Sequence, residues 1–171
     1  MGLTKIASKV FLPRQKELER HYTNPEKIQH HVLKHLVEKG CETEYGRTHI
    51  FSGINNYSDF TKNVPINTYE ELKNDIDRMR HGEQDVLWPG LIKWFAKSSG
   101  TTNDKSKFIP VSNAGLHRIH YKGGADVVAL YLCNNPQSRL FDGKSLILGG
   151  SHSPNYNVEG SLVGDLSAIL I

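Results

Sequence analysis

The sequence predicts an α/β fold, in which N-terminal helices are followed by part of a mixed sheet with helices. Apolar residues recur at helical spacing within residues 1–40. Two short apolar runs, residues 91–96 and 108–111, are rich in aromatic and branched side chains and are typical of strands. We therefore expect a single region over residues 1–171, with a helical part over 1–40 and an α/β part over 64–171.

The first forty residues predict helices with defined interruptions. Pro13 predicts a break, because proline lacks a backbone donor and clashes with the preceding turn. Asn24 and Pro25 form a helix start, with an N-cap residue followed by proline in the first turn. We expect a helix over residues 25–39. The apolar residues that set the helical spacing are Leu3, Ile6, Val10, Ile28, Val32, Leu36 and Val37.

A capped helix is predicted just before the first apolar run. Thr68 and Glu71 have the spacing of a capping box, in which each side chain bonds the backbone N–H of the other residue. We expect the helix to run to about His81 and to end at Gly82. A shorter helix is expected over residues 57–62. The buried stripe of the capped helix is predicted to be Leu72, Ile76 and Met79.

The C-terminal half predicts a long helix, a buried strand and an apolar end. Ser112 is a suitable cap for a helix that runs to about Cys133. The glycine pair at 123–124 allows close backbone approach, or marks a tolerated defect or a break into two helices. Residues 145–148 predict a buried strand. Residues 162–171 form an apolar end with nothing after it, so we expect a chain that is truncated relative to a longer protein.

Composition favours an intracellular globular protein. The chain has 37% hydrophobic residues and a net charge of +3. Its two isolated cysteines, Cys41 and Cys133, fit a reduced protein better than a disulfide scaffold. No apolar stretch is long enough to span a membrane, and no signal-peptide core is present. We expect cytoplasmic localisation and no membrane partner.

The charge is uneven along the chain. Residues 1–40 hold eight Lys/Arg and four Asp/Glu, a net of +4, whereas residues 41–171 hold 13 and 14, a net of −1. Basic helices could touch RNA or a membrane surface, but the acidic residues are interspersed, so we expect solvated faces and no nucleic-acid partner. His31 and His35 lie one turn apart and could share zinc, yet no third ligand adjoins them, which favours solvated histidines.

Residues 97–107 connect the two expected strands and are almost entirely small, hydroxylated or basic. The connection is longer than a tight hairpin turn, and loops of this kind are often functional. Hydroxyls, lysines and a glycine that allows close backbone approach suit a phosphate group. A plain polar hairpin loop is the alternative. The segment matches neither the Walker A pattern nor the dinucleotide-binding fingerprint.

The motif S-S-G-T-T-x-x-x-S-K at 98–107, flanked by W-F-A-K and F-I-P-V, resembles the first ATP-binding motif of the auxin-responsive acyl-acid amido synthetase family. That family belongs to the adenylate-forming superfamily. Members are several times longer, so the chain is similar to their N-terminal part only. Further similar segments are T-E-Y-G-R at 43–47, V-P-I-N-T-Y-E-E-L at 64–72, D-V-L-W-P-G at 85–90 and V-G-D-L-S-A-I-L at 163–170.

The resemblance implies a ligase that uses ATP and Mg²⁺. The family adenylates a carboxylic acid and then transfers the acyl group to an amine, often of an amino acid. By position, the phosphate-binding residues implied here are Ser98, Ser99, Gly100, Thr101, Thr102 and Lys107. Lys105 stands where the family varies. Arg118 and Tyr121, one turn apart, are candidates for contact with the acyl substrate, against the alternative of an exposed helix face.

The family motifs that hold adenine and ribose have no candidate in this chain. We therefore expect the 171 residues alone to be inactive. The first rival hypothesis is a non-catalytic remnant that serves as a binding module. The second is a small basic nucleic-acid binder that uses residues 1–40, which lacks the aromatic side chains of single-strand binders.

Overall fold

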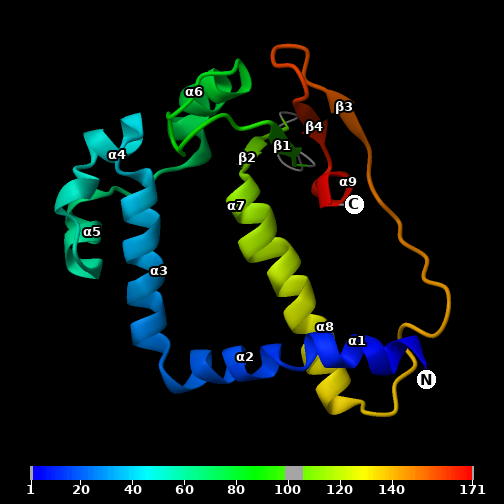
Figure 1. The fold of residues 1–171 in the computed structure, drawn as a ribbon. Coiled ribbons are helices and arrows are strands. Elements are labelled where there is room, and N and C mark those ends of the chain that lie inside the picture. Colours follow the sequence, from blue (N-terminus) through cyan, green and yellow to red (C-terminus); the bar gives the residue numbers. More distant parts are fainter. Residues whose placement is uncertain (1, 99–105, 171) are drawn as a thin grey trace. The chain divides into compact units, whose positions relative to one another are not determined.

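The computed structural model describes residues 2–98 and 106–170 (Figure 1). The chain divides into two compact units, Met1–Ile28 with Asn113–Leu148, and Gln29–Ser112 with Gly149–Ile171. The helices and strands have the mixed α/β composition that the sequence predicts, while the expectation of a single region stays a prediction.

The first unit is helical, and in Figure 1 α1 and α2 are dark blue while its later helices run from yellow-green to yellow. Its elements are α1 (Leu3–Phe11), α2 (Arg14–Thr23), α7 (Asn113–Gly115), a π-helical segment (Leu116–Tyr121) and α8 (Lys122–Asn134). The interruption at Pro13 is confirmed, since α1 ends before it and α2 begins after it. The long helix after Ser112 is confirmed as well. It continues through both glycines, so the predicted alternative of a break into two helices is wrong.

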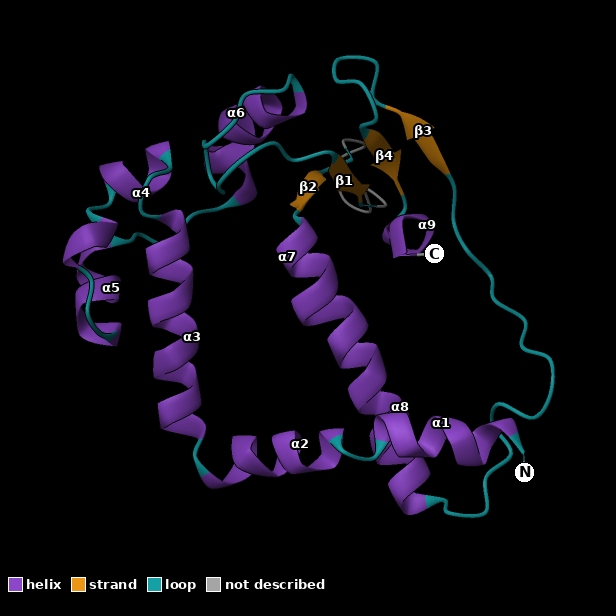
Figure 2. Cartoon of the chain, viewed as in Figure 1, coloured by secondary structure: helices purple, strands orange, loops and turns teal. Residues whose placement is uncertain are grey.

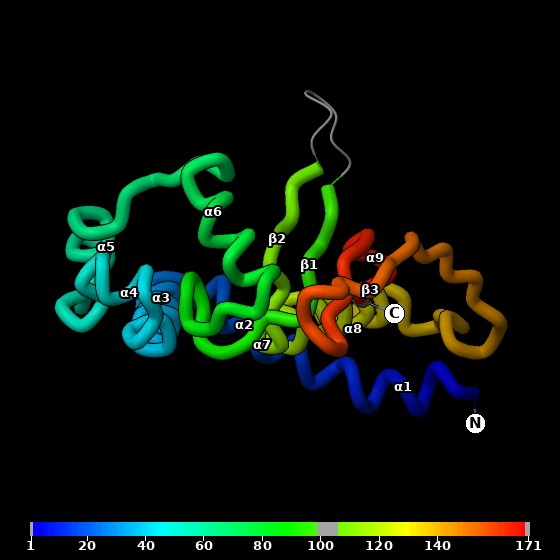
Figure 3. The backbone as a smooth tube through the Cα atoms, turned by 90° about the horizontal axis from the view of Figure 1, so that it is seen from above, coloured from blue at the N-terminus to red at the C-terminus, as the bar shows by residue number. Residues whose placement is uncertain are grey.

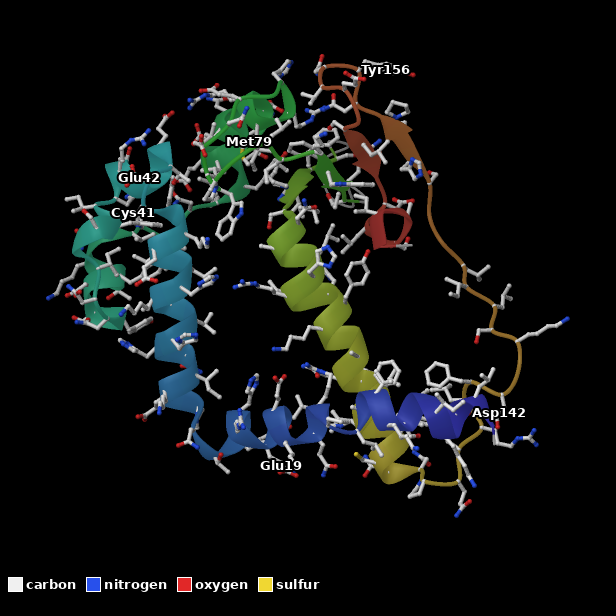
Figure 4. All side chains as sticks on the ribbon, viewed as in Figure 1. Glu19, Cys41, Glu42, Met79, Asp142 and Tyr156 are labelled. Atoms are coloured by element: carbon white, nitrogen blue, oxygen red, sulfur yellow. The ribbon has the colours of Figure 1, made fainter. Side chains whose placement is uncertain are left out.

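Polar contacts fasten α1 and α2 within this unit. The buried Thr4 donates from its backbone N–H to Asp142 Oδ1 at 2.9 Å and from its hydroxyl to the same oxygen at 3.1 Å. The ring of Phe11 stacks on Phe141 with centroids 5.9 Å apart. Arg14 pairs with Asp126 of α8. Figure 4 shows Asp142 beside the start of α1. One face of α1 is therefore held against residues that follow α8.

The second unit contains a four-stranded sheet and its covering helices (Figure 2). The strands are β1 (Trp94–Lys97), β2 (Phe108–Val111), β3 (His152–Pro154) and β4 (Leu162–Gly164). Their order is β2-β1-β4-β3. Strand β1 pairs antiparallel with β2 and parallel with β4, and β3 pairs antiparallel with β4, so the sheet is mixed, as predicted.

Among the described residues, six helical elements belong wholly or mostly to this unit. They are α3 (Pro25–Gly40), whose first residues up to Ile28 are assigned to the first unit, α4 (Glu44–Thr48), a 3₁₀ turn (Phe51–Gly53), α5 (Tyr57–Asn63), α6 (Tyr69–Arg80) and α9 (Leu166–Leu170). The helices predicted over 25–39 and 57–62 are confirmed within one residue. The capping box of α6 is also confirmed, with Thr68 N–H donating to Glu71 Oε2 at 2.6 Å.

The core of the second unit lies where α6 packs on the sheet. Phe95 of β1 is completely buried, and Met79 of α6 is 1% exposed. Ile76, Val86 and Ile92 complete this cluster. The predicted stripe of α6 is confirmed for its two buried members, Ile76 and Met79, because three- and four-residue spacings place them on one helical face.

The predicted buried strand at residues 145–148 is wrong. This segment has no strand pairing, and Leu146, Ile147 and Leu148 are exposed. The strands form later, with β3 in a polar stretch and β4 at the start of the apolar end. An apolar run becomes a strand only where a neighbouring strand accepts its backbone hydrogen bonds, and the available edge of β1 pairs with β4 instead.

Acid is expected to weaken the first unit through Asp142. The hydrogen bond from the Thr4 backbone stabilises the carboxylate and holds the pKa of Asp142 below its ordinary value. A pKa that is lower in the folded than in the unfolded state stabilises above the unfolded value, near pH ~4, and this stabilisation is lost as pH falls through the folded pKa. In Asp142→Asn, the free energy of unfolding should be lower at neutral pH, and its decline in acid should be shallower.

Denaturant unfolding at a series of pH values measures this difference. The matched control is Glu159→Gln, which changes an exposed carboxylate of the second unit. A difference between the protein and Asp142→Asn that stays constant from neutral pH to strong acid would contradict the role of the Asp142 charge.

Candidate functional site

The described ends of the loop meet at the neck of the β1–β2 hairpin. Lys97 pairs with Phe108 as the last residues of the two strands. Beyond them, Ser98 N–H donates to the Lys107 carbonyl at 2.9 Å, and Lys107 N–H donates to Ser98 Oγ at 3.1 Å. The structure therefore brings together two of the predicted site residues, Ser98 and Lys107. Figure 3 shows β1 and β2 side by side up to this point.

The other predicted site residues lie outside the described residues. They are Ser99, Gly100, Thr101 and Thr102, and the doubtful Lys105 lies there too. Their role in phosphate binding therefore stays a prediction. The described residues show how the two ends of the loop, Ser98 and Lys107, are held.

Helix α6 holds the base of the hairpin through its first residue, Tyr69. The Tyr69 hydroxyl accepts a hydrogen bond from Phe108 N–H at 3.0 Å. The Lys107 ammonium lies 5.3 Å from the centroid of the Tyr69 ring, within the range of a cation–π contact. The capping box fixes this first turn of α6. Hydrogen bonds from the Thr68 backbone and hydroxyl hold the pKa of the Glu71 carboxyl below its ordinary value.

The last residue of α6, Arg80, also contacts the hairpin. Its guanidinium carbon lies 3.7 Å from the centroid of the Phe108 ring. Arg80 Nη1 pairs with Asp77 at 2.9 Å, and its buried Nε has no hydrogen-bond partner within the described parts of the chain. Tyr69 and Arg80 thus contact Phe108 of β2 from the two ends of one helix. Helix α6 therefore determines where the hairpin neck, Ser98 and Lys107, lies.

A cavity of ≈ 690 Å³ opens beside the neck. The hairpin lines it with Lys97, Ser98, Ser106 and Phe108, and α6 contributes Arg80. The remaining wall comes from the β3–β4 arm, residues 151–165, which carries several hydroxyl and amide groups. Figure 4 shows Tyr156 on this arm and Met79 on α6. The cavity therefore combines two cations, Lys97 and Arg80, with hydroxyls and one carboxylate, Asp165. The cations and hydroxyls are donors that suit a phosphate-bearing ligand.

Two buried polar residues hold the β3–β4 arm in place. Asn155 Nδ2 donates to the carbonyl of Arg80 at 2.9 Å and to Ser161 Oγ at 3.1 Å. The Ser161 hydroxyl donates to the carbonyl of Lys93, just before β1, at 2.7 Å. These bonds join the end of α6, the start of β1 and the arm. Sequence reasoning missed both residues, because Asn and Ser in a glycine-containing polar stretch are typical of a loop.

Gly164 in the cavity wall lies where strands β3 and β4 approach each other closely. A Cβ atom added to Gly164 would overlap the Ser151 carbonyl oxygen and the backbone of His152. Gly164 pairs directly with His152 across β3 and β4. The absent side chain therefore lets the two strands lie close together and form this part of the wall.

Metal ions require sets of ligand side chains that lie close together. Among residues 2–98 and 106–170, no group of three or more His, Cys, Asp or Glu side chains lies close enough to hold an ion. His31 and His35 thus have no third ligand in the described chain. No helix in the same ranges is long and apolar enough to cross a membrane.

The candidates for acyl-substrate contact lie in the first unit. Arg118 and Tyr121 both belong to the π-helical segment between α7 and α8, where the ring of Tyr121 lies 5.4 Å from that of His117. A π-helical turn is uncommon and occurs often at functional sites. The role of these residues stays a prediction.

Comparison with known proteins gives consistent sequence matches. A family profile described as "GH3 family N-terminal domain" matches residues 14–171. The chain is 35% identical over 134 residues to indole-3-acetic acid-amido synthetase GH3.15 of Arabidopsis thaliana, an alignment that covers 76% of this chain and 21% of the relative. It is 32% identical over 108 residues to 4-substituted benzoates-glutamate ligase GH3.12 of the same plant, covering 63% and 19%.

Solved structures agree with these matches. The GH3.15 acyl acid amido synthetase matches with a TM-score of 0.75 and 30% identity, over 91% of this chain and 28% of that one. AtGH3.15 acyl acid amido synthetase in complex with 2,4-DB matches with a TM-score of 0.76 and 27% identity, over 95% and 28%. The chain spans about a fifth of the length of the curated relatives. Its relatives are amido synthetases, and the chain itself belongs to the GH3 family, whose N-terminal domain it matches.

Proposed function

We propose that this chain supplies the phosphate-binding part of an ATP-dependent acyl-acid amido synthetase. The observation that carries the proposal is the pair of hydrogen bonds between Ser98 and Lys107, which lies beside a cavity lined by cations and hydroxyls. Family membership supports the reaction class. The substrates would be a carboxylic acid and an amine, such as an amino acid, and the cytoplasm is the proposed compartment because Cys41 and Cys133 are free thiols.

The reaction has two steps in this proposal. A carboxylate oxygen attacks the α-phosphorus of ATP, the bond from that phosphorus to the bridging oxygen breaks, and pyrophosphate leaves. The amine nitrogen then attacks the acyl carbon, AMP leaves with the bonding electron pair, and the amine loses a proton. Charge builds up on the departing pyrophosphate in the first step, so preorganised donors around the phosphates lower its barrier.

The predicted loop residues would provide those donors. Hydroxyls of Ser98, Ser99, Thr101 and Thr102 and backbone amides around Gly100 would bind phosphate oxygens, and Lys107 would add a cation. The oxygen-rich cavity wall, with Ser106 and Asp165, is compatible with Mg²⁺, which prefers hard oxygen ligands. When bound, Mg²⁺ would neutralise phosphate charge, and we assign no residue as its ligand.

The acyl substrate is proposed to contact the π-helical segment. An arginine such as Arg118 suits a carboxylate through paired hydrogen bonds, and the Tyr121 ring suits an apolar body. The names of the relatives include indole-3-acetic acid and substituted benzoates, which are carboxylic acids. We extend to this protein the class of acid alone.

The alternative is a non-catalytic binding module. The exposed apolar run at residues 146–148 favours it, because clustered exposed apolar side chains mark interaction sites. The two hypotheses differ in their dependence on ATP, which only the ligase requires.

ATP affinity should depend on the hairpin neck. In Lys107→Met and Ser98→Ala, the dissociation constant of ATP with magnesium should rise about tenfold or more, because a hydrogen bond to a charged group contributes ~1.5–3 kcal/mol. Titration calorimetry measures the constant. Lys62→Met, which alters an exposed lysine of α5, is the matched control and should bind as the unaltered protein does. Equal affinities for Lys107→Met and Lys62→Met would refute the phosphate role of Lys107.

The Tyr69 ring and hydroxyl should have separable effects. Tyr69→Phe leaves Phe108 N–H without an acceptor and should cost ~1–3 kcal/mol of unfolding free energy, yet keep the ring under Lys107 and the ATP affinity. Tyr69→Leu should lower both. Urea denaturation and ATP titration measure the two quantities, with Tyr57→Phe, an exposed tyrosine, as control. An ATP affinity that falls equally in both Tyr69 variants would exclude a ring-specific role.

The 171 residues by themselves should not complete adenylation. Purified chain is expected to show no carboxylate-dependent exchange of labelled pyrophosphate into ATP, because adenine and ribose contacts have no candidate here. Exchange above a no-carboxylate control, lost in Lys107→Met, would overturn this expectation and would show that the chain is an enzyme on its own.

A further inference from the structure

Helix α1 presents two different faces. The face with Thr4 and Phe11 is held by Asp142 and Phe141 within the first unit. A different face carries a stripe of apolar side chains, which we call the α1 stripe. Its members are Leu3 at 64%, Ile6 at 50% and Val10 at 69% exposure. Their spacing of three and four residues places them together on one side of the helix. Exposed apolar surface of this extent on a nine-residue helix has no partner within the described chain.

The charged residues of α1 itself have one sign, while the carboxylate of Asp142 is bonded to Thr4 on the fastened face. Lys5 and Lys9 lie exposed on α1, one turn apart, and form no ion pair in the described part of the chain. The sequence contains no acidic residue before Glu17. All four acidic residues of the segment 1–40 therefore follow Pro13. The expected mixture of acidic and basic residues is present in α2 and α3 but not in α1. An apolar stripe flanked by lysines is the pattern of a helix that lies in a membrane interface.

We propose that α1 is a docking surface for an anionic phospholipid membrane. The α1 stripe would enter the boundary between headgroups and acyl chains, and Lys5 and Lys9 would contact anionic headgroups. The helix would lie along the surface, in keeping with the absence of any membrane-spanning helix from the described residues. The match to the family profile starts at residue 14, so α1 falls outside it. This proposal is independent of the proposed ligase function.

Charge complementarity selects a membrane over a second copy of the chain. Two α1 stripes packed together would bring four lysines close, with no carboxylate on α1 to pair with them. The exposed apolar residues of α8 include Val127 and Leu130, but Lys122, the first residue of α8, is paired with Glu17, and the helix also carries Asp126. Of these two helices, α1 is the one whose lysines have no carboxylate partner among the described residues.

Sedimentation with vesicles tests the lysines. The protein should partition into phosphatidylcholine vesicles that contain phosphatidylserine, and far less into pure phosphatidylcholine. The Lys5→Gln, Lys9→Gln double variant should lower the partition coefficient about 25-fold, since each lysine near an anionic surface contributes ~1 kcal/mol. The control double variant Lys62→Gln, Lys144→Gln removes two other exposed lysines and should change it less than about twofold. Added salt should weaken binding, because it screens the headgroup charge.

A second pair of variants tests the stripe. Val10→Ser should reduce partitioning about tenfold, whereas Val127→Ser, which changes an equally exposed valine on α8, should not. Thermal unfolding verifies that each variant remains folded, which is expected because both valines are largely exposed. Absence of binding to phosphatidylserine vesicles would overturn the proposal, as would equal losses in the α1 and control variants. Concentration-dependent dimers that Val10→Ser abolishes, without vesicle binding, would identify a second copy as the occupant.

Discussion

The packing of α6 on β1 is the constraint on which the second unit depends. Phe95 is completely buried between the sheet and α6, where Met79 and Ile76 cover it. This contact sets the distance of the helix from the sheet. Its two ends then reach β2, with Tyr69 bonded to the backbone of Phe108 and Arg80 over the Phe108 ring. Helix α6, packed on the buried Phe95, therefore contacts the hairpin from both of its ends. Because protein interiors are close-packed, the position of α6 determines the position of the hairpin.

The cavity follows from that arrangement. The end of α6 offers the Arg80 carbonyl to Asn155, and the residue before β1 offers its carbonyl to Ser161. Buried polar groups need such partners, because an unsatisfied one costs free energy. The β3–β4 arm is consequently held against the same two elements that support the hairpin neck. Cations of the hairpin and of α6 thus face hydroxyls of a segment more than forty residues further along the chain.

The first unit uses a different principle. Its helices bury few large side chains, and apolar residues of α1 and α8 remain exposed. Polar contacts of Thr4 with Asp142 and of Arg14 with Asp126 fasten the helices instead. Hydrogen bonds and ion pairs at a surface stabilise modestly, so this unit has less of its stability in a core than the second unit does. Its exposed apolar faces are free to meet other surfaces.

The sequence by itself determined the helices, the hairpin and the family resemblance. The break at Pro13, the start at Asn24 and the capping box at Thr68 are local signals, in which residues a few positions apart satisfy one another's backbone groups. The strand pair around the loop is equally local, and the loop motif carried the resemblance that the family match confirmed.

Only the tertiary structure decided what depends on distant partners. The parallel pairing of β1 with β4, the exposure of residues 146–148 and the bond of Asn155 to Arg80 each join or separate segments far apart in the chain. Hydrophobicity says that a segment tends to be buried, but strand pairing needs a neighbour with free backbone groups, and that neighbour is chosen by the whole fold. The difference between the two faces of α1 likewise depends on Asp142, a residue far along the chain that bonds to one of them.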